Sequence, residues 1–205
     1  KFALASENIK VKDSENNISV LDIYGNRYLT IKNNTIKPGD FLRSANGPAV
    51  LLMDNNKICF SKNSSIKIKS INNSKKLIKI IVLKGKFLFY TNQLSGFKYH
   101  IKINNNIIEN NLGYIFLSKN PQNSFAIKTF KDNSYLYTNS SKKIKLNPYS
   151  FYDFKSKVTS KKNKNLFKKS DFLNQCFRKN YILSLPKEFK YKCSSLKNKI
   201  YCGYQ

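Results

Sequence analysis

The sequence predicts an all-β protein that ends in a short, lysine-rich appendage. From residue 18 to residue 154, short runs of Ile, Val, Leu, Phe and Tyr alternate with Lys, Asn and Ser, which is the period-two pattern of half-buried strands. Residues that favour chain reversal interrupt these runs about every 8 to 12 positions. No helical period persists for two turns in this range. Hydrophobic residues make up 40% of the chain, which is enough to build a core.

The chain of 205 residues is expected to hold one domain and an extension. Residues 1–17 are a lead-in, in which Ala3-Leu4-Ala5 fits the cleavage pattern of a secretory signal peptide and predicts a periplasmic or secreted protein. An ordinary strand start would give the same three residues. Residues 18–154 form the β-domain, and residues 155–205 form the extension. No later run reaches the ~18 apolar residues that a membrane-spanning helix needs, so no transmembrane segment is expected.

Five stretches of the β-domain are examples of the expected strands. They are ISVLDIYGNRYLTIKNN (18–34), AVLLMDNNKICFSKNSSIKIKS (49–70), IKIIVLKGKFLFY (78–90), SFAIKTFKDNSYLYTN (124–139) and KIKLNPYSFYDF (143–154). In such strands, apolar positions face the core and polar positions face water. The third stretch is interpreted as a strand pair, because Gly85 between two lysines gives a turn signal in its middle.

Turn residues mark the corners of the predicted fold. Gly39 allows a backbone conformation that other residues resist, and the Asp40 carboxylate is expected to accept hydrogen bonds from turn amides. Asp54-Asn55 and Asp132-Asn133 can replace Asp-Gly in tight hairpins, so their carboxylates are interpreted as turn formers rather than as acid–base catalysts. Arg43 projects beside the first turn, either as a brace that pairs with a nearby carboxylate or as a contact for a partner.

The extension combines a lysine cluster with one predicted helix. The cluster is typical of a solvated linker and is also a candidate partner contact; it contains Lys161, Lys162, Lys164, Lys168 and Lys169. Ser170 is a candidate N-cap for a short helix that Pro186 would end. The side chains that would share one face of this helix are Phe172, Leu173, Cys176 and Phe177.

The chain has four cysteines. In an oxidising compartment, Cys176, Cys193 and Cys202 could supply one disulfide bond, with Cys193–Cys202 favoured because it closes a short loop. The sequence does not choose among the pairings, and in the cytosol all the cysteines, Cys59 included, would be thiols. There is no Cys-x-x-Cys pair and His100 is the single histidine, so no structural metal site is expected.

The net charge of +27 predicts attraction to acidic partners. Arg27, Arg43 and Arg178 are the arginines among the 38 basic residues, whereas bidentate phosphate and base-edge recognition favour the guanidinium group. Much of the charge is therefore interpreted as the composition of an A/T-rich bacterial genome. An envelope protein or an acidic polymer is the favoured partner. Nucleic-acid or polyanion binding through residues 155–205 remains the alternative.

The corners and strands between residues 39 and 89 resemble the FecR domain, the periplasmic sensor module of iron-citrate signalling regulators. The matching residues are Gly39, Asp40, Leu42, Arg43, Ser44, 49–53, Asp54, Asn55, Ile58, Phe60, Asn63, Ser64, Val82, Gly85, Phe87 and Phe89. Ser44, Asn55 and Val82 depart from the Thr, Gly and Leu of the family pattern, which affects turns and packing. The resemblance is looser up to residue 154.

The resemblance implies small sheets coiled around an apolar interior, with β-solenoid or jelly-roll character, and a non-enzymatic exported domain that binds an envelope protein or polymer. It brings no catalytic group, cofactor or metal. The sequence is consistent with this expectation, since it contains no P-loop, no Gly-x-Gly-x-x-Gly motif and no Gly-x-Ser-x-Gly motif. His100 lies near no nucleophile signature and is interpreted as a packed or surface imidazole.

Overall fold

The structure is a computed structural model, and it describes only part of the chain. The described residues are 8–15, 18–30, 33–53, 55–92, 97–119, 125–129, 134–138, 142–147, 150–153, 158–161, 172, 176, 191–196 and 199–204. The chain divides into two compact units, residues 1–161 and residues 162–205, which are described separately. Within the described part, no helix has both the length and the apolar character needed to cross a membrane.

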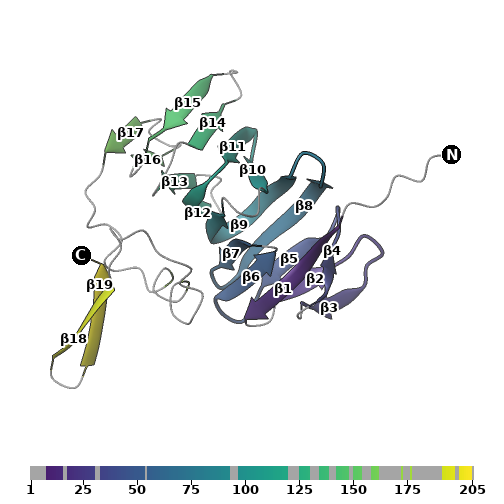
Figure 1. Cartoon of the computed structure of the whole chain (residues 1–205), viewed down its shortest axis with the longest axis horizontal. Helices are drawn as coiled ribbons and strands as arrows, with labels where there is room; N and C mark the ends of the chain where they lie inside the picture. Colours follow the sequence, from purple (N-terminus) through teal and green to yellow (C-terminus); the bar gives the residue numbers. More distant parts are fainter. Residues whose placement is uncertain are drawn as a thin grey trace. The chain divides into compact units, whose positions relative to one another are not determined.

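The first unit consists of strands, as the sequence predicts (Figure 1). They are β1 (Ile9–Glu15), β2 (Ile18–Leu21), β3 (Arg27–Leu29), β4 (Thr35–Ile36), β5 (Phe41–Ser44), β6 (Ala49–Met53), β7 (Asn56–Phe60), β8 (Ser64–Asn72), β9 (Leu77–Thr91), β10 (Lys98–Ile103), β11 (Asn106–Asn110), β12 (Gly113–Lys119), β13 (Phe125–Thr129), β14 (Ser134–Tyr137), β15 (Lys143–Leu146), β16 (Ser150–Asp153) and β17 (Val158–Lys161). The all-β fold class is confirmed.

These strands form a 17-stranded network that folds into two sheets sharing β9, and β4 joins the network by pairing with β1. We call β3-β2-β5-β8-β9-β10-β11-β14-β15 sheet 1 and β1-β6-β7-β9-β12-β13-β16-β17 sheet 2. All these pairs are antiparallel except β9–β10, which is parallel. The network is an open mixed sheet rather than a closed barrel.

Successive hairpins after β9 alternate between the two sheets. β10–β11 belongs to sheet 1, β12–β13 to sheet 2, β14–β15 to sheet 1 and β16–β17 to sheet 2. The chain therefore coils back and forth around a common interior, as the resemblance to the FecR domain implies. Short loops suffice for this path, because antiparallel neighbours need only tight connections.

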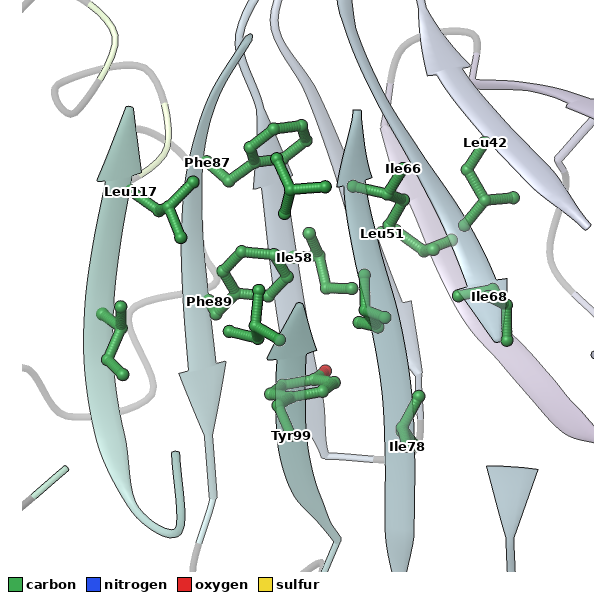
Figure 2. Close-up of a cluster of buried hydrophobic side chains, with 14 of the residues drawn as sticks. Leu42, Leu51, Ile58, Ile66, Ile68, Ile78, Phe87, Phe89, Tyr99 and Leu117 are labelled. Carbon is green, nitrogen blue, oxygen red and sulfur yellow. The ribbon is translucent and has the colours of Figure 1, made fainter. Parts of the chain in front are cut away.

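The inner faces of the two sheets meet in one apolar core (Figure 2). A row of aromatic rings crosses it: the ring centroids of Phe60 and Phe87 are 5.4 Å apart, those of Phe87 and Phe89 are 5.8 Å apart, and those of Phe89 and Tyr99 are 5.6 Å apart. Phe89 belongs to the part of β9 in sheet 2, whereas Tyr99 lies on β10 in sheet 1. The Phe89–Tyr99 contact therefore joins the sheets.

Gly85 is the point at which β9 passes from one sheet to the other. The strand pairs with β8 and β10 before this residue and with β7 and β12 after it. The turn expected at Lys84-Gly85-Lys86 is therefore wrong: the strand bends but continues. Gly85 has φ 109°, and a Cβ added there would lie 2.6 Å from the Cα of Ser64. Only glycine combines this conformation with so close a neighbour.

The strands of the first unit extend beyond residues 18–154. β1 begins at Ile9, pairs with β4 and β6, and buries Val11 completely. At the other end, β17 pairs with β16 and ends at Lys161. Residues on both sides of the expected β-domain thus take part in its sheets.

The second unit contains the hairpin of β18 (Tyr191–Leu196) and β19 (Lys199–Tyr204). Its register sets Cys193 opposite Cys202, although the bridge between them stays a prediction. Phe172 and Cys176, four residues apart on the predicted helix, are helical and buried. Cys176 is disulfide-bonded, and so is Cys59, which the sequence did not assign to a bridge.

Candidate functional site

The outer face of sheet 1 carries a groove that combines basic and apolar side chains. Its volume is about 360 Å³. The residues that line it are Ser19, Val20, Leu21, Arg27, Phe41, Leu42, Arg43, Ser65, Leu83 and Lys84. They come from β3, β2, β5, β8 and β9, which are consecutive neighbours in the sheet. The groove is thus built on paired strands rather than on long loops.

Strand register explains which side chains meet in the groove. One row across the strands contains Leu29, Ser19, Arg43, Ser65 and Lys84. The adjacent row contains Arg27, Leu21, Phe41 and Lys67. Because side chains alternate between the two faces of a strand, both rows point away from the core that holds Val20 and Leu42.

Two features of the sequence make this surface concave. Arg43 has a serine on each side in its row, Ser19 and Ser65, and these short side chains leave space around the guanidinium group. In addition, Ser65 pairs with Lys84 while Ile66 pairs with Val82, so Leu83 is an extra residue in β9. This β-bulge places Leu83, 38% exposed, in the groove lining.

The lining is positively charged. Arg27, Arg43 and Lys84 are exposed, and no Asp or Glu belongs to the lining. Both arginines of residues 1–161 are here, although lysine dominates the rest of the chain. Lys67 Nζ lies 4.7 Å from the centre of the Phe41 ring, which adds a fourth cation at the edge. Uncompensated charge of one sign in a concave site attracts ligands of the opposite sign.

Arg43 does not act as the predicted brace to Asp40. The carboxylate of Asp40 is buried, and its Oδ2 accepts a hydrogen bond from the Lys37 amide at 2.8 Å. Within the described part of the chain, the Arg43 guanidinium makes no ion pair; Asp54, the other partner considered for it, lies outside the described residues. The Arg43 side chain is exposed and contributes to the groove lining.

Of the predicted turn residues, Gly39 and Asp40 lie in the turn that leads into β5, next to this surface. The Asp40 amide donates to the Lys37 carbonyl at 3.2 Å, and Gly39 has φ 98°, as in a type II turn with Pro38 before the glycine. Asn55 lies in the two-residue connection between β6 and β7, whose ends Met53 and Asn56 are partners. Asp132 and Asn133 lie outside the described residues.

A second hollow, of about 580 Å³, contains carboxylates that are already engaged. Asp22 Oδ1 accepts from the amides of Tyr24 and Asn26, at 2.9 and 2.8 Å. Asp40 is bonded to the turn as described above. Within the described ranges, no group of three or more His, Cys, Asp or Glu could hold a metal ion. We infer that this hollow is shaped by turn formation.

His100 faces a single carboxylate on the other half of sheet 1. It is half-buried on β10 and lies opposite Glu109 on β11. Glu109 Oε2 accepts a hydrogen bond from the Tyr137 hydroxyl at 2.9 Å. Burial lowers the pKa of the His100 imidazole, which favours its neutral form. Neither of the two hollows described above includes this group.

Replacement of Asp40 should reveal the effect of its burial on the pH dependence of stability. Burial raises the pKa of this carboxyl above its ordinary value. The folded protein therefore binds the proton more tightly than the unfolded chain, and the free energy of unfolding should fall as pH rises from about 4 through the raised pKa. We expect Asp40→Asn to remove this decrease in urea unfolding at several pH values, since its amide oxygen can still accept from Lys37.

Asp40→Ala supplies the control, because it leaves the Lys37 amide without its acceptor. Compared with Asp40→Asn, it should lower the free energy of unfolding by about 1 to 3 kcal/mol at all pH values in this range, because neither variant has a carboxyl group at this position. An unchanged pH dependence in Asp40→Asn would show that another group causes it.

The lysine cluster contributes no described side chain to a site. Lys161 ends β17, whereas Lys162, Lys164, Lys168 and Lys169 lie outside the described residues. Among the lining residues, Arg43 alone was a candidate contact in the sequence analysis, and the residues missed include Arg27, Phe41, Leu83 and Lys84. The sequence does show that Arg27 and Arg43 are both arginines in alternating strands. Only the strand register shows that the two side chains lie on the same face of sheet 1.

The fold is similar to that of a solved bacterial protein. The crystal structure of a "putative anti-sigma factor" from Parabacteroides distasonis ATCC 8503 matches with a TM-score of 0.50 and 10% sequence identity, over 62% of this chain and 61% of that chain. At this identity the likeness concerns the fold alone, and it spans less than two thirds of that protein. No family model matches the chain, and the search of curated proteins gives no match. Membership of the FecR family is therefore not shown.

Proposed function

We propose that residues 8–161 form a sensor-type binding domain without a catalytic role, which recognises an acidic envelope partner through the groove of sheet 1. The observation that carries this proposal is the gathering of Arg27, Arg43 and Lys84 around one hollow with no acidic lining residue. A rigid sheet holds these cations in fixed positions, which lowers the entropy lost when a partner binds.

Three further observations support the proposal. The solved protein of similar fold carries the name of an anti-sigma factor, which is a class of regulator. The FecR resemblance of residues 39–89 points to a sensor module. The disulfide-bonded state of Cys59 and Cys176 fits an oxidising compartment outside the cytoplasm.

Salt-dependent binding of two polyanions by the full chain tests the proposal. The probes are poly-L-glutamate and a DNA duplex, each measured by fluorescence anisotropy at several salt concentrations. We expect the paired charge reversal Arg27→Glu/Arg43→Glu to weaken poly-L-glutamate binding about tenfold or more, since it removes two charge-assisted contacts and adds repulsion.

The matched control is Lys162→Glu/Lys164→Glu, which changes the net charge by the same amount. It should weaken binding no more than about twofold if only long-range attraction is lost. A larger loss from this control than from the groove variant would favour polyanion binding through residues 155–205. Steeply salt-dependent DNA binding that the control variant removes would point the same way and overturn the proposal.

A further inference from the structure

The groove is more apolar than a site for a hydrated ion would need to be. Leu21 and Phe41 are partly exposed beside Arg43, and Leu83 projects from the bulge in β9. A small inorganic anion would leave these side chains in water. A ligand with an apolar part would cover them and gain the free energy of that burial.

We propose that the groove binds an amphiphilic anion, with its carboxylate or phosphate head group at Arg43 and a short apolar tail over Leu21, Phe41 and Leu83. This inference rests on the proposed function, because it specifies the kind of acidic group that the basic face recognises. Arg27 and Lys84 lie on opposite sides of Arg43, each two strands away, or roughly 10 Å across the sheet. Both have long side chains that can reach toward a bound head group.

The use of arginine supports a compact anionic head group. A guanidinium group forms paired hydrogen bonds with carboxylate or phosphate and is less strongly hydrated than an ammonium group. It therefore suits a site in which the ligand also displaces water from apolar side chains. The two serines beside Arg43 are short and keep the space around its guanidinium group open. The Ser19 hydroxyl donates to the Arg43 carbonyl at 3.3 Å, so Ser65 is the serine that offers its hydroxyl group to the ligand.

The size of the groove limits the apolar tail. Its volume of about 360 Å³ lies near the lower end of the roughly 300–1,000 Å³ that is typical of small-molecule sites. A short acyl or alkyl chain fits this space, whereas an extended lipid would project from it. The same chemistry could come from a free short-chain acid or phosphate ester, or from the exposed part of an anionic lipid.

Titration calorimetry of the full chain with monomeric octyl phosphate tests the inference. Inorganic phosphate serves as the ligand without a tail, and octyltrimethylammonium serves as the ligand with the opposite charge. We expect octyl phosphate to bind at least tenfold more tightly than either. Equal affinity for inorganic phosphate would overturn the inference while leaving the proposed function in place, because charge alone would then explain binding.

Variants separate the two parts of the site. Arg27→Glu/Arg43→Glu should weaken octyl phosphate binding at least tenfold, whereas Lys142→Glu/Lys145→Glu, with the same charge change beside and on β15, should leave it nearly unchanged. Leu83→Ser should weaken binding about three- to tenfold, and Ile107→Ser, at a similarly exposed position on β11, should not. Insensitivity to Leu83→Ser would rule out the tail contact.

Vesicles distinguish the two sources of ligand. If the chain binds vesicles that contain phosphatidylglycerol, and octyl phosphate displaces it, the head group comes from a membrane. Binding of octyl phosphate without binding to these vesicles indicates a free ligand. Vesicle binding that octyl phosphate cannot displace would place the membrane contact elsewhere and contradict the inference. The proposed function itself would be contradicted by a different result: poly-L-glutamate binding that Arg27→Glu/Arg43→Glu weakens no more than the control variant does.

Discussion

Gly85→Ala is expected to lower the free energy of unfolding by about 3 kcal/mol or more. Two causes act together. The residue has φ 109°, where an alanine is strained, and an added Cβ would lie 2.1 Å from Ser64 Oγ and 2.6 Å from Ser64 Cα. The side chain of Ser64 could turn aside, but its backbone is fixed by pairing with Ser44. Urea unfolding followed by far-UV circular dichroism measures the change.

Gly25→Ala is the matched control for the backbone conformation. Gly25 also has a positive φ, 86°, but a Cβ added to it would have no other atom within 4 Å. Its replacement should therefore carry only the conformational strain, about 1 kcal/mol. Equal losses from the two variants would show that the close approach of Ser64 to Gly85 contributes nothing.

Phe89→Ala should destabilise the first unit by about 3 to 5 kcal/mol. Phe89 is completely buried and contacts the rings of Phe87 and Tyr99, so its removal opens a cavity at the contact between the sheets. The same urea titration tests this expectation. The slope of free energy against urea should stay unchanged if the variant loses stability without changing the surface exposed on unfolding.

Ile107→Ala provides the comparison for Phe89. Ile107 is 39% exposed on β11, so truncation of its side chain should cost less than about 1 kcal/mol. Phe89→Leu should retain most of the stability, because it keeps an apolar side chain of similar volume. A small effect of Phe89→Ala would contradict the assignment of this residue to the contact between sheets 1 and 2.

Much of the fold follows from the local pattern of the sequence. Alternation in residues 18–154 predicts the strands, because every second side chain of these antiparallel strands faces the core. The Gly39 turn follows from its own residues and from Pro38. The continuity of β9 does not follow from the local sequence, because a glycine between two lysines is compatible with a turn as well as with a bend in a continuous strand. The approach of Ser64 to Gly85, which decides between them, joins residues far apart in sequence.

The groove could be predicted only in part. Arg43 was a candidate contact, but Arg27 and Lys84 reach the same surface through four pairings among five strands. Such register depends on the packing of the whole sheet and not on neighbours in sequence. The bulge at Leu83 adds one residue to β9, and simple alternation cannot reveal that shift. The involvement of Cys59 in a disulfide bond likewise has no local signal.

β9 forms hydrogen bonds with four other strands, two in sheet 1 and two in sheet 2. Neither sheet can therefore unfold completely while the other keeps all of its interstrand hydrogen bonds. Loss of this strand would expose the edges of β8 and β10 on one side and of β7 and β12 on the other. The first unit should therefore lose its order in one concerted step, and its slowest-exchanging amide protons should belong to β9 on both sides of the bend.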